Sequence, residues 1–297
     1  MLVYLDQNKW IQLAKIINGK ETSEEAICLL EEIKASLKCG YSYPLSVIHY
    51  MEFARISNLG RRQRLGKVMW DYSKNKTLIS TREIVIHELE NALSKFFPEI
   101  KPKNINILGT GMFNAFGVNN TDSIPALSSH IDEVMLTGAS DLEIEPIQHF
   151  NSEYRENFQE HLRSLHQKMA NVEKVNIDNW LHAIALKDIS EPLTSVLLRY
   201  RISESRISSL SAKDYSEIIH AMPTRALDVH LHKQVLKNRT YNSKLSDLED
   251  WAGLGVAASY CDIVVCEKHF ADMLKRDGYK TKARIVTNMR DIFEAVV

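Results

Sequence analysis

The stretch Leu2-Val3-Tyr4-Leu5-Asp6-Gln7-Asn8 begins with apolar and aromatic residues and then changes abruptly to polar ones. A near-continuous apolar run is typical of a strand that is buried on both faces of a parallel sheet. Open α/β sheets bind ligands outside the carboxyl ends of their strands, which is where Asp6 would lie. Asp6 could instead cap the helix that follows, a common role of aspartate. Both roles are compatible with this stretch.

The size and composition of the chain indicate a globular protein with a large insertion. At 297 residues it exceeds the usual single-domain length, so we expect one elaborated domain. A content of 44% hydrophobic and 25% charged residues supports a buried core, and a formal net charge of -1 excludes a strongly basic chain of the histone kind. The four cysteines form no zinc or disulfide pattern, and the sequence contains no long apolar run. We therefore expect a cytoplasmic protein without a secretory leader or a membrane span.

Strand-like and helix-like patterns alternate over the first 80 residues. Apolar residues recur at helical spacing over 9–17, 23–37 and 47–56, and the aromatic run 41–45 predicts a second strand. Ser46 then stands at the N-cap position of the helix 47–56. Glu52 shares a flank of that helix with apolar residues, so we expect it to be partly desolvated. Pairing with Arg55 or exposure to solvent is the structural alternative.

A basic window lies between Phe53 and Trp70, where no acidic residue occurs. Such a run is ordinarily a solvated surface. Next to a carboxylate site, it would instead bind a phosphate backbone. The candidate nucleic-acid-binding residues in this window are Arg55, Arg61, Arg62, Arg64 and Lys67.

Residues 81–240 are predicted to be a mostly helical insertion. Helical spacing recurs over 82–97, 149–169, 178–186, 191–210 and 224–237. The glycines near residue 110 lack the spacing of a dinucleotide fingerprint or a P-loop, so we expect a glycine-rich loop over 105–125. The histidines of the insertion lie on separate segments without a His-Glu-x-x-His pattern, and we interpret them as surface or core residues.

The α/β pattern returns after residue 240. A helix rich in small residues is predicted from 247 to 260, and its first turn carries Asp247 and Asp250 on one face. The apolar run 262–266 predicts a third strand that ends at Glu267, just as the first run ends at Asp6. A strand over 283–287 and a helix over 289–296 complete the pattern.

Parallel packing of these strands would bring Asp6, Glu52, Asp250 and Glu267 to one end of the sheet. Four carboxylates cannot all stay ionised at close range without a cation, because their mutual repulsion raises their pKa values. Oxygen ligands suit Mg²⁺ or Mn²⁺, and such an ion activates water in phosphodiester cleavage. We therefore predict a metal site here, in which Asp247 replaces or assists Asp250.

Together, these residues resemble the PIN-like nucleases over 1–60 and 240–297. The shared pattern is a strand that ends in Asp-x-Asn, a serine before a helix with a glutamate, and an aspartate followed by a small-residue helix, a strand and an acid. The resemblance implies a three-layer α/β/α fold with a central parallel sheet. In such a fold, residues 1–80 and 241–297 would form the nuclease domain, and residues 81–240 would be inserted into it. It also implies that Asn8 and Ser46 support the metal-binding acids, although the last acid is Glu rather than the more usual Asp.

The resemblance further implies a metal-dependent endonuclease that prefers RNA. A DNA or structure-specific nuclease that resembles flap endonucleases is the alternative within the same chemistry. A non-catalytic nucleic-acid-binding or scaffold protein is the alternative from another class. A toxin-like or antiviral setting would add an inhibitory or regulatory protein partner, and the insertion could form a homo-oligomer.

Overall fold

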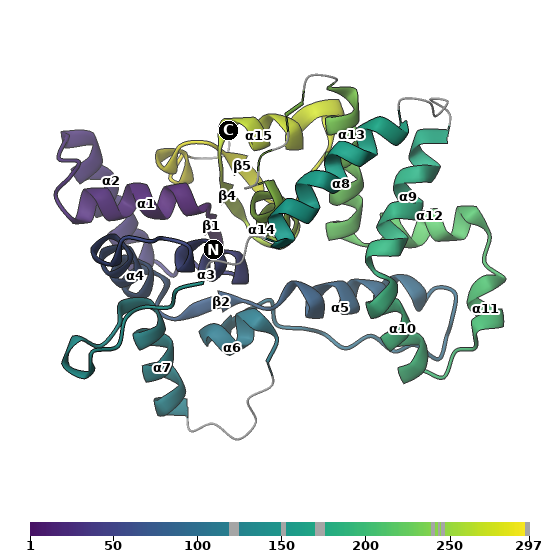
Figure 1. Ribbon diagram of the computed structural model, residues 1–297, viewed down its shortest axis with the longest axis horizontal. Helices are drawn as coiled ribbons and strands as arrows, with labels where there is room; N and C mark the ends of the chain where they lie inside the picture. The colour runs from purple at the N-terminus through teal and green to yellow at the C-terminus, as the bar shows by residue number, and fades with distance from the viewer. Residues whose placement is uncertain are drawn as a thin grey trace.

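The computed structural model describes residues 1–118, 125–149, 153–169, 176–238, 241–242, 244 and 247–294. These residues form a small parallel sheet surrounded by helices, which is the predicted α/β class (Figure 1). The sheet has the order β1 (Val3–Leu5), β4 (Ile263–Val265) and β5 (Arg284–Val286). All pairings in it are parallel, with Val3 opposite Ile263 and Ile263 opposite Arg284. The two ends of the chain therefore build one sheet, as the sequence predicts.

Beyond β1 the sheet continues through isolated bridges. Leu2 pairs with Ser42, and Leu45 pairs with Thr77 of β2 (Lys76–Leu78), both in parallel. The strand predicted over 41–45 is thus reduced to two bridges. Pro44 lies between them and has no N–H to donate to a ladder.

The loop expected over 105–125 contains regular structure. β3 (Leu108–Thr110) pairs antiparallel with β2 and leads into α6 (Gly111–Phe116), while residues 119–124 lie outside the described ranges. The glycines permit close packing here. A Cβ at Gly109 would lie 2.4 Å from the Asn114 side chain, and a Cβ at Gly111, whose φ is +84°, would lie 2.4 Å from Asp132.

The first three N-terminal helices follow the predicted periodicities and end near the expected residues, whereas the helix over the basic window, α4, was not predicted. Each has a polar N-cap residue, and that of α3 is Ser46. Their apolar faces pack around β1 in a cluster that includes Trp10 and Phe53. The helices are α1 (Gln7–Ile17), α2 (Glu24–Lys38), α3 (Val47–Ala54) and α4 (Leu59–Ser73).

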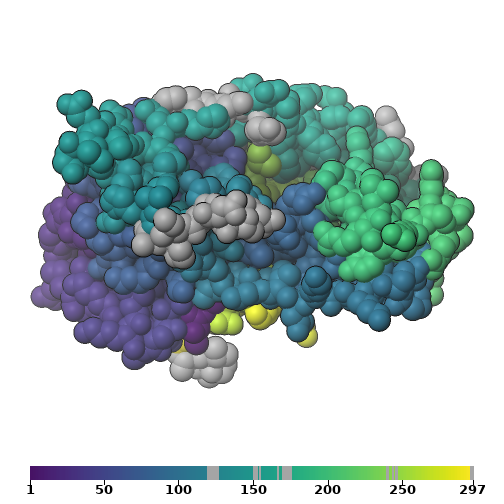
Figure 2. All heavy atoms as spheres, turned by 90° about the horizontal axis from the view of Figure 1, so that it is seen from below, coloured from purple at the N-terminus to yellow at the C-terminus, as the bar shows by residue number. Residues whose placement is uncertain are grey.

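The described part of 81–240 is largely helical, and its helices α10 to α12 lie at the opposite end of the molecule from α2 (Figures 1 and 2). The single helix expected over 191–210 is divided, because Arg201 has a left-handed φ of 56°. The elements are α5 (Thr81–Leu93), α7 (Pro125–Thr137), η1 (Ser140–Leu142), α8 (Glu153–Met169), α9 (Ile177–Asp188), α10 (Ser190–Arg199), α11 (Glu204–Ser208), α12 (Ala212–His220) and α13 (Pro223–Lys237).

The helical segment has a core of its own and also shares cores with the sheet. One hydrophobic cluster is built from buried residues between Val85 and Met222. A second cluster joins Leu231 of α13 to Trp251 and to the sheet. A Cβ at Gly66 of α4 would overlap the backbone of Leu136, so α7 packs closely on α4. The division into two domains stays a prediction.

The C-terminal part supplies the remaining layer. α14 (Asp247–Tyr260) packs against β4 and α8 (Figure 1), and its Gly253 lies so close to β1 that a Cβ there would be 2.6 Å from the Tyr4 hydroxyl. α15 (Lys268–Lys275) and η3 (Arg276–Gly278) precede β5. The final helix expected over 289–296 is instead the short 3-10 turn η4 (Met289–Ile292), since Arg284 donates to the carbonyls of Asp291 and Ile292 at 2.7 and 3.0 Å. Residues 295–297 lie outside the described ranges.

Candidate functional site

Asp6 combines the two roles that the sequence left open. Its N–H donates to the Val265 carbonyl at 3.0 Å, which places it at the carboxyl ends of β1 and β4. Its carboxylate accepts the Gln7 N–H at 2.8 Å and so caps α1. Burial raises the pKa of Asp6 to about 6, and the charge of Glu267 adds to the rise.

Asn8 connects the ends of the two strands. Its side-chain amide donates to Glu267 at 2.5 Å. Glu267 follows β4 directly, is exposed to solvent and makes no capping hydrogen bond of its own to α15. Asn8 therefore orients the carboxylate of Glu267 at the end of β4, while its role in supporting a metal site stays a prediction.

Glu52 and Asp250 bring two further carboxyl groups to this end of the sheet. Burial raises the pKa of Glu52 to about 8, and the charges of Asp6 and Asp250 raise it further. Burial also raises the pKa of Asp250 to about 8, followed by the charges of Asp6, Glu267 and Asp247. All four predicted acids therefore influence one another, although they come from four separate segments.

Asp247 has a different local role. It is buried, and its carboxylate accepts the Tyr241 hydroxyl and the Lys244 N–H, each at 2.8 Å. Both hydrogen bonds fall on Oδ2 of Asp247, the first residue of α14, and direct this oxygen toward the segment that precedes the helix. Asp250 is therefore the better placed of the two aspartates for a ligand at the sheet end.

Ser46 contributes to the site by fixing the start of α3, and not by binding a ligand itself. Its N–H donates to His49 Nδ1 at 2.9 Å, and His49 Nε2 lies 2.7 Å from the Leu5 carbonyl, to which it donates. Burial lowers the pKa of His49 to about 4, which keeps the ring neutral in this tautomer. The arrangement ties the start of α3, and thus Glu52, to the end of β1.

The donor chemistry of the four acids fits a hard divalent cation. Carboxylate oxygens are its preferred protein ligands, and the charge of such an ion would relieve the repulsion that raises these pKa values. Within the described part of the chain, however, no group of three His, Cys, Asp or Glu side chains is positioned to hold one ion. The four acids therefore fit a divalent cation in their ligand type and in their location. Their carboxylates have to move closer together to share one ion.

Two arginines lie beside this cluster and are held by a buried glutamate. Glu249 is 1% exposed and pairs with Arg55, the residue directly after α3, and with Arg155 Nε of α8, the latter at 3.1 Å. Both arginine charges lower the pKa of Glu52, against the larger effect of burial. Together with burial, Arg155 lowers the pKa of Arg55, which indicates that two like charges are held near each other.

Sequence reasoning missed Glu249 and Arg155 as parts of this site. The one available signal was the excess of acids in the first turn of α14, which is more negative charge than a helix N-terminus requires. Nothing local indicates that α8 supplies the second arginine.

Within the basic window between Phe53 and Trp70, Arg62 is not exposed as a nucleic-acid-binding residue would be. Arg61, Arg64 and Lys67 are exposed on α4, and Lys67 pairs with Asp71 at 3.3 Å. Arg62 is 0% exposed and donates to the Ile56 carbonyl at 2.6 Å. It also pairs with Glu145 at 3.0 Å, so it cannot contact a phosphate. The assignment of Arg62 to nucleic-acid binding was wrong, because this position faces inward with Leu65, Gly66 and Met69 at helical spacing.

Comparisons with protein-family models, curated proteins and solved structures each find no match. None of the helices in the described ranges is both long and apolar enough to cross a membrane.

Proposed function

We propose that this chain is a metal-dependent endonuclease with a three-layer PIN-like fold, and that RNA is its substrate. One observation carries the proposal. Asp6, Glu52, Asp250 and Glu267 come from four segments to the carboxyl ends of β1 and β4, where burial and mutual repulsion raise the pKa values of three of them. A cluster of buried carboxyl groups lowers the stability of the fold unless a cation neutralises it. Groups with strongly shifted pKa values of this kind are common at functional sites.

The four acids would hold Mg²⁺ or Mn²⁺, which supplies charge neutralisation and an acidified water when bound. The chain's own residues have separate tasks. Asn8 orients Glu267, and the Gln7 N–H fixes Asp6. A pKa of about 8 means that Glu52 retains a proton near neutral pH without a cation, and the site must release this proton before the acid can act as a ligand.

Arg55 and Arg155 supply the positive charge that a phosphodiester needs. Their shared partner Glu249 is buried and holds both guanidinium groups next to the acids. Guanidinium groups bind phosphate oxygens in a fixed planar geometry. The exposed Arg61 and Arg64 of α4 would contact phosphates farther along the strand.

The experiment is a cleavage assay on labelled single-stranded RNA and DNA with Mg²⁺, with Mn²⁺ and with chelator. We expect cleavage of RNA that depends on the metal and is absent in Asp6→Asn. The exposed Asp272 of α15 provides a matched control, so Asp272→Asn should cleave normally. Cleavage of DNA alone would favour the structure-specific alternative, and binding without cleavage would favour a scaffold.

From the resemblance to PIN-like nucleases we also propose a biological setting for this chain. It consists of a cytoplasmic location, a regulatory protein partner and a homo-oligomer formed through the insertion. The free thiols of all four cysteines are compatible with a reducing compartment.

A further inference from the structure

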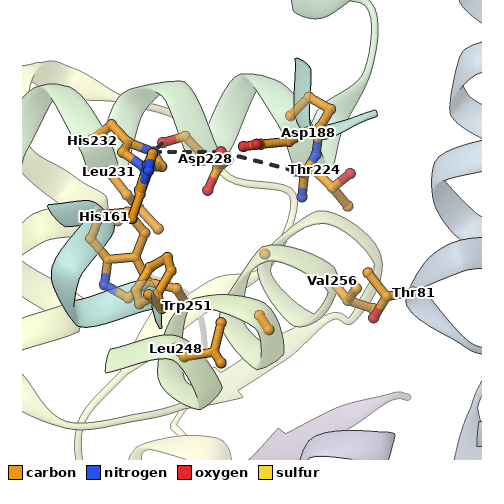
Figure 3. A pocket seen from close by; sticks show the side chains of 14 residues that line it. Thr81, His161, Asp188, Thr224, Asp228, Leu231, His232, Leu248, Trp251 and Val256 are labelled. Atoms are coloured by element: carbon orange, nitrogen blue, oxygen red, sulfur yellow. Dashed lines mark hydrogen bonds and ion pairs between the residues drawn. The ribbon is translucent and has the colours of Figure 1, made fainter. Parts of the chain in front are cut away.

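A cavity of about 330 Å³ lies on the side of α14 that faces α8, α9 and α13 (Figure 3). Its volume is at the lower end of the range of small-molecule sites. Leu248, Trp251 and Gly255 of α14 line it, whereas none of the four acids at the sheet end does. The cavity is therefore distinct from the carboxylate cluster, although α14 contributes to both.

One wall of the cavity is aromatic. The rings of Phe158 and Trp251 meet edge to face at 5.6 Å, and His232 meets Trp251 at 4.9 Å. His161 lies 5.8 Å from His232, again edge to face. Figure 3 shows His161, His232 and Trp251 grouped on one side of the space, with Asp188 and Asp228 along another. A flat, ring-shaped ligand suits such a wall.

The polar side of the cavity is dominated by hydrogen-bond acceptors. His232 is 3% exposed, and its Nδ1 lies 2.9 Å from the Asp228 carbonyl oxygen, to which it donates. In the neutral ring, Nε2 is then an acceptor, and it has no hydrogen-bond partner among the described residues. Asp188 and Asp228 add two carboxylates, and burial, followed by the charge of Asp228, raises the pKa of Asp188. Arg225, which pairs with Asp228 at 3.9 Å, adds a guanidinium group.

We propose that this cavity binds a guanine base. A carboxylate that accepts two parallel hydrogen bonds requires a flat ligand with two adjacent N–H donors. Guanine is the RNA base that offers them, at N1 and the 2-amino group, and its O6 and N7 acceptors match an arginine. Asp188 or Asp228 would accept from the donor edge, Arg225 would donate to the acceptor edge, and the ring would pack against Phe158 and Trp251.

The base can belong to a free nucleotide or to an RNA strand, and the proposal does not rest on nuclease activity. Guanosine is the probe, and its affinity for the full chain is measured by calorimetry beside inosine, adenosine and cytidine. Inosine lacks only the 2-amino group, so we expect it to bind about 10-fold more weakly than guanosine. Equal binding of all four nucleosides, or no binding of guanosine, overturns the proposal.

Two variants locate the binding to this cavity. Asp188→Asn replaces an acceptor with a group that also donates, and should weaken guanosine binding by about 10- to 100-fold and abolish the preference over inosine. If Asp188→Asn binds normally, Asp228→Asn must show this loss. A Cβ at Gly255 would meet nothing within 4 Å, so Gly255→Leu should fill the cavity without a clash and prevent binding while the thermal unfolding temperature is kept.

Asp272→Asn, on α15 and outside the cavity, is the matched control and should bind guanosine as the wild type does. Unchanged binding in Gly255→Leu, or in both aspartate variants, overturns the assignment of the site. Competition with a short single-stranded RNA then distinguishes the two sources. If the site takes a base of RNA, a guanine-containing strand displaces guanosine and a uridine strand does not. If it takes a free nucleotide, neither strand does.

Discussion

Replacing Asp6 by Asn should make the cation-free protein more stable at neutral pH. Asn is as good an N-cap as Asp, so the cap on α1 is kept while the charge is removed. Each pKa unit corresponds to 1.36 kcal/mol, so a rise from 3.8 to about 6 costs about 3 kcal/mol of folding free energy at pH 7. The Asp6→Asn variant would lose the favourable interaction of the Asp6 charge with the N-terminus of α1, and this loss reduces the gain in stability by up to about 1 kcal/mol. We therefore expect a net gain of about 2 to 3 kcal/mol in the free energy of unfolding.

The pH dependence distinguishes the cost of a buried charge, to which Glu267 adds repulsion, from a packing effect. The pKa of Asp6 is raised on folding, so its cost is absent below the unfolded value of 3.8 and grows until the pH passes about 6. Urea unfolding in chelator at pH 4, 5.5 and 7 should show no gain at pH 4 and the full gain at pH 7. If Asp6→Asn lowers the free energy of unfolding at all three pH values, Asp6 is a structural cap and the account of the cluster fails.

Further predictions concern the basic residues and the buried histidine. Arg61→Glu combined with Arg64→Glu should weaken RNA binding and flatten its salt dependence at unchanged stability, whereas Arg62→Glu should destabilise the fold by about 3 to 5 kcal/mol in urea unfolding. Arg155→Gln should lower the rate of RNA cleavage and reduce the salt slope of binding by about 0.7, and an unchanged slope would remove Arg155 from the phosphate site. The pKa of His49 is lowered on folding to about 4, so stability should fall by about 3 kcal/mol between pH 6.5 and 4. His49→Gln should show less of this loss in the same unfolding series.

The strands at the two ends of the chain could be predicted because their patterns are local and strong. Val3–Leu5 and Ile263–Val265 are continuous apolar runs, which is what burial on both faces requires, and each is followed at once by a polar segment. Ser46 and the helical spacing after it likewise identified the start of α3. Parallel packing of these elements predicts that all four acids lie at one end of the sheet.

The missed features depend on contacts between distant segments. Arg62 lies in a basic run, and only its register on α4 shows that it faces inward toward Glu145. Arg155 reaches Glu249 from a helix whose packing the sequence does not specify. The helix expected after Met289 is shortened because Arg284, on a neighbouring strand, bonds to its carbonyls. In each case a polar contact with another element decides the outcome, and the local pattern does not encode that contact.

Calorimetric titration with Mn²⁺ tests the central claim most directly, namely that the four acids hold a divalent cation. Glu52 and Asp250, with pKa values of about 8, carry protons at pH 7 and must lose them when they ligate the ion. Titrations in buffers of different ionisation enthalpy should therefore show release of about one proton or more per ion bound. In Glu52→Gln the affinity should fall and the release should shrink, while Asp272→Asn should match the wild type. Absence of Mn²⁺ binding, or binding that Glu52→Gln leaves unchanged, would contradict the account.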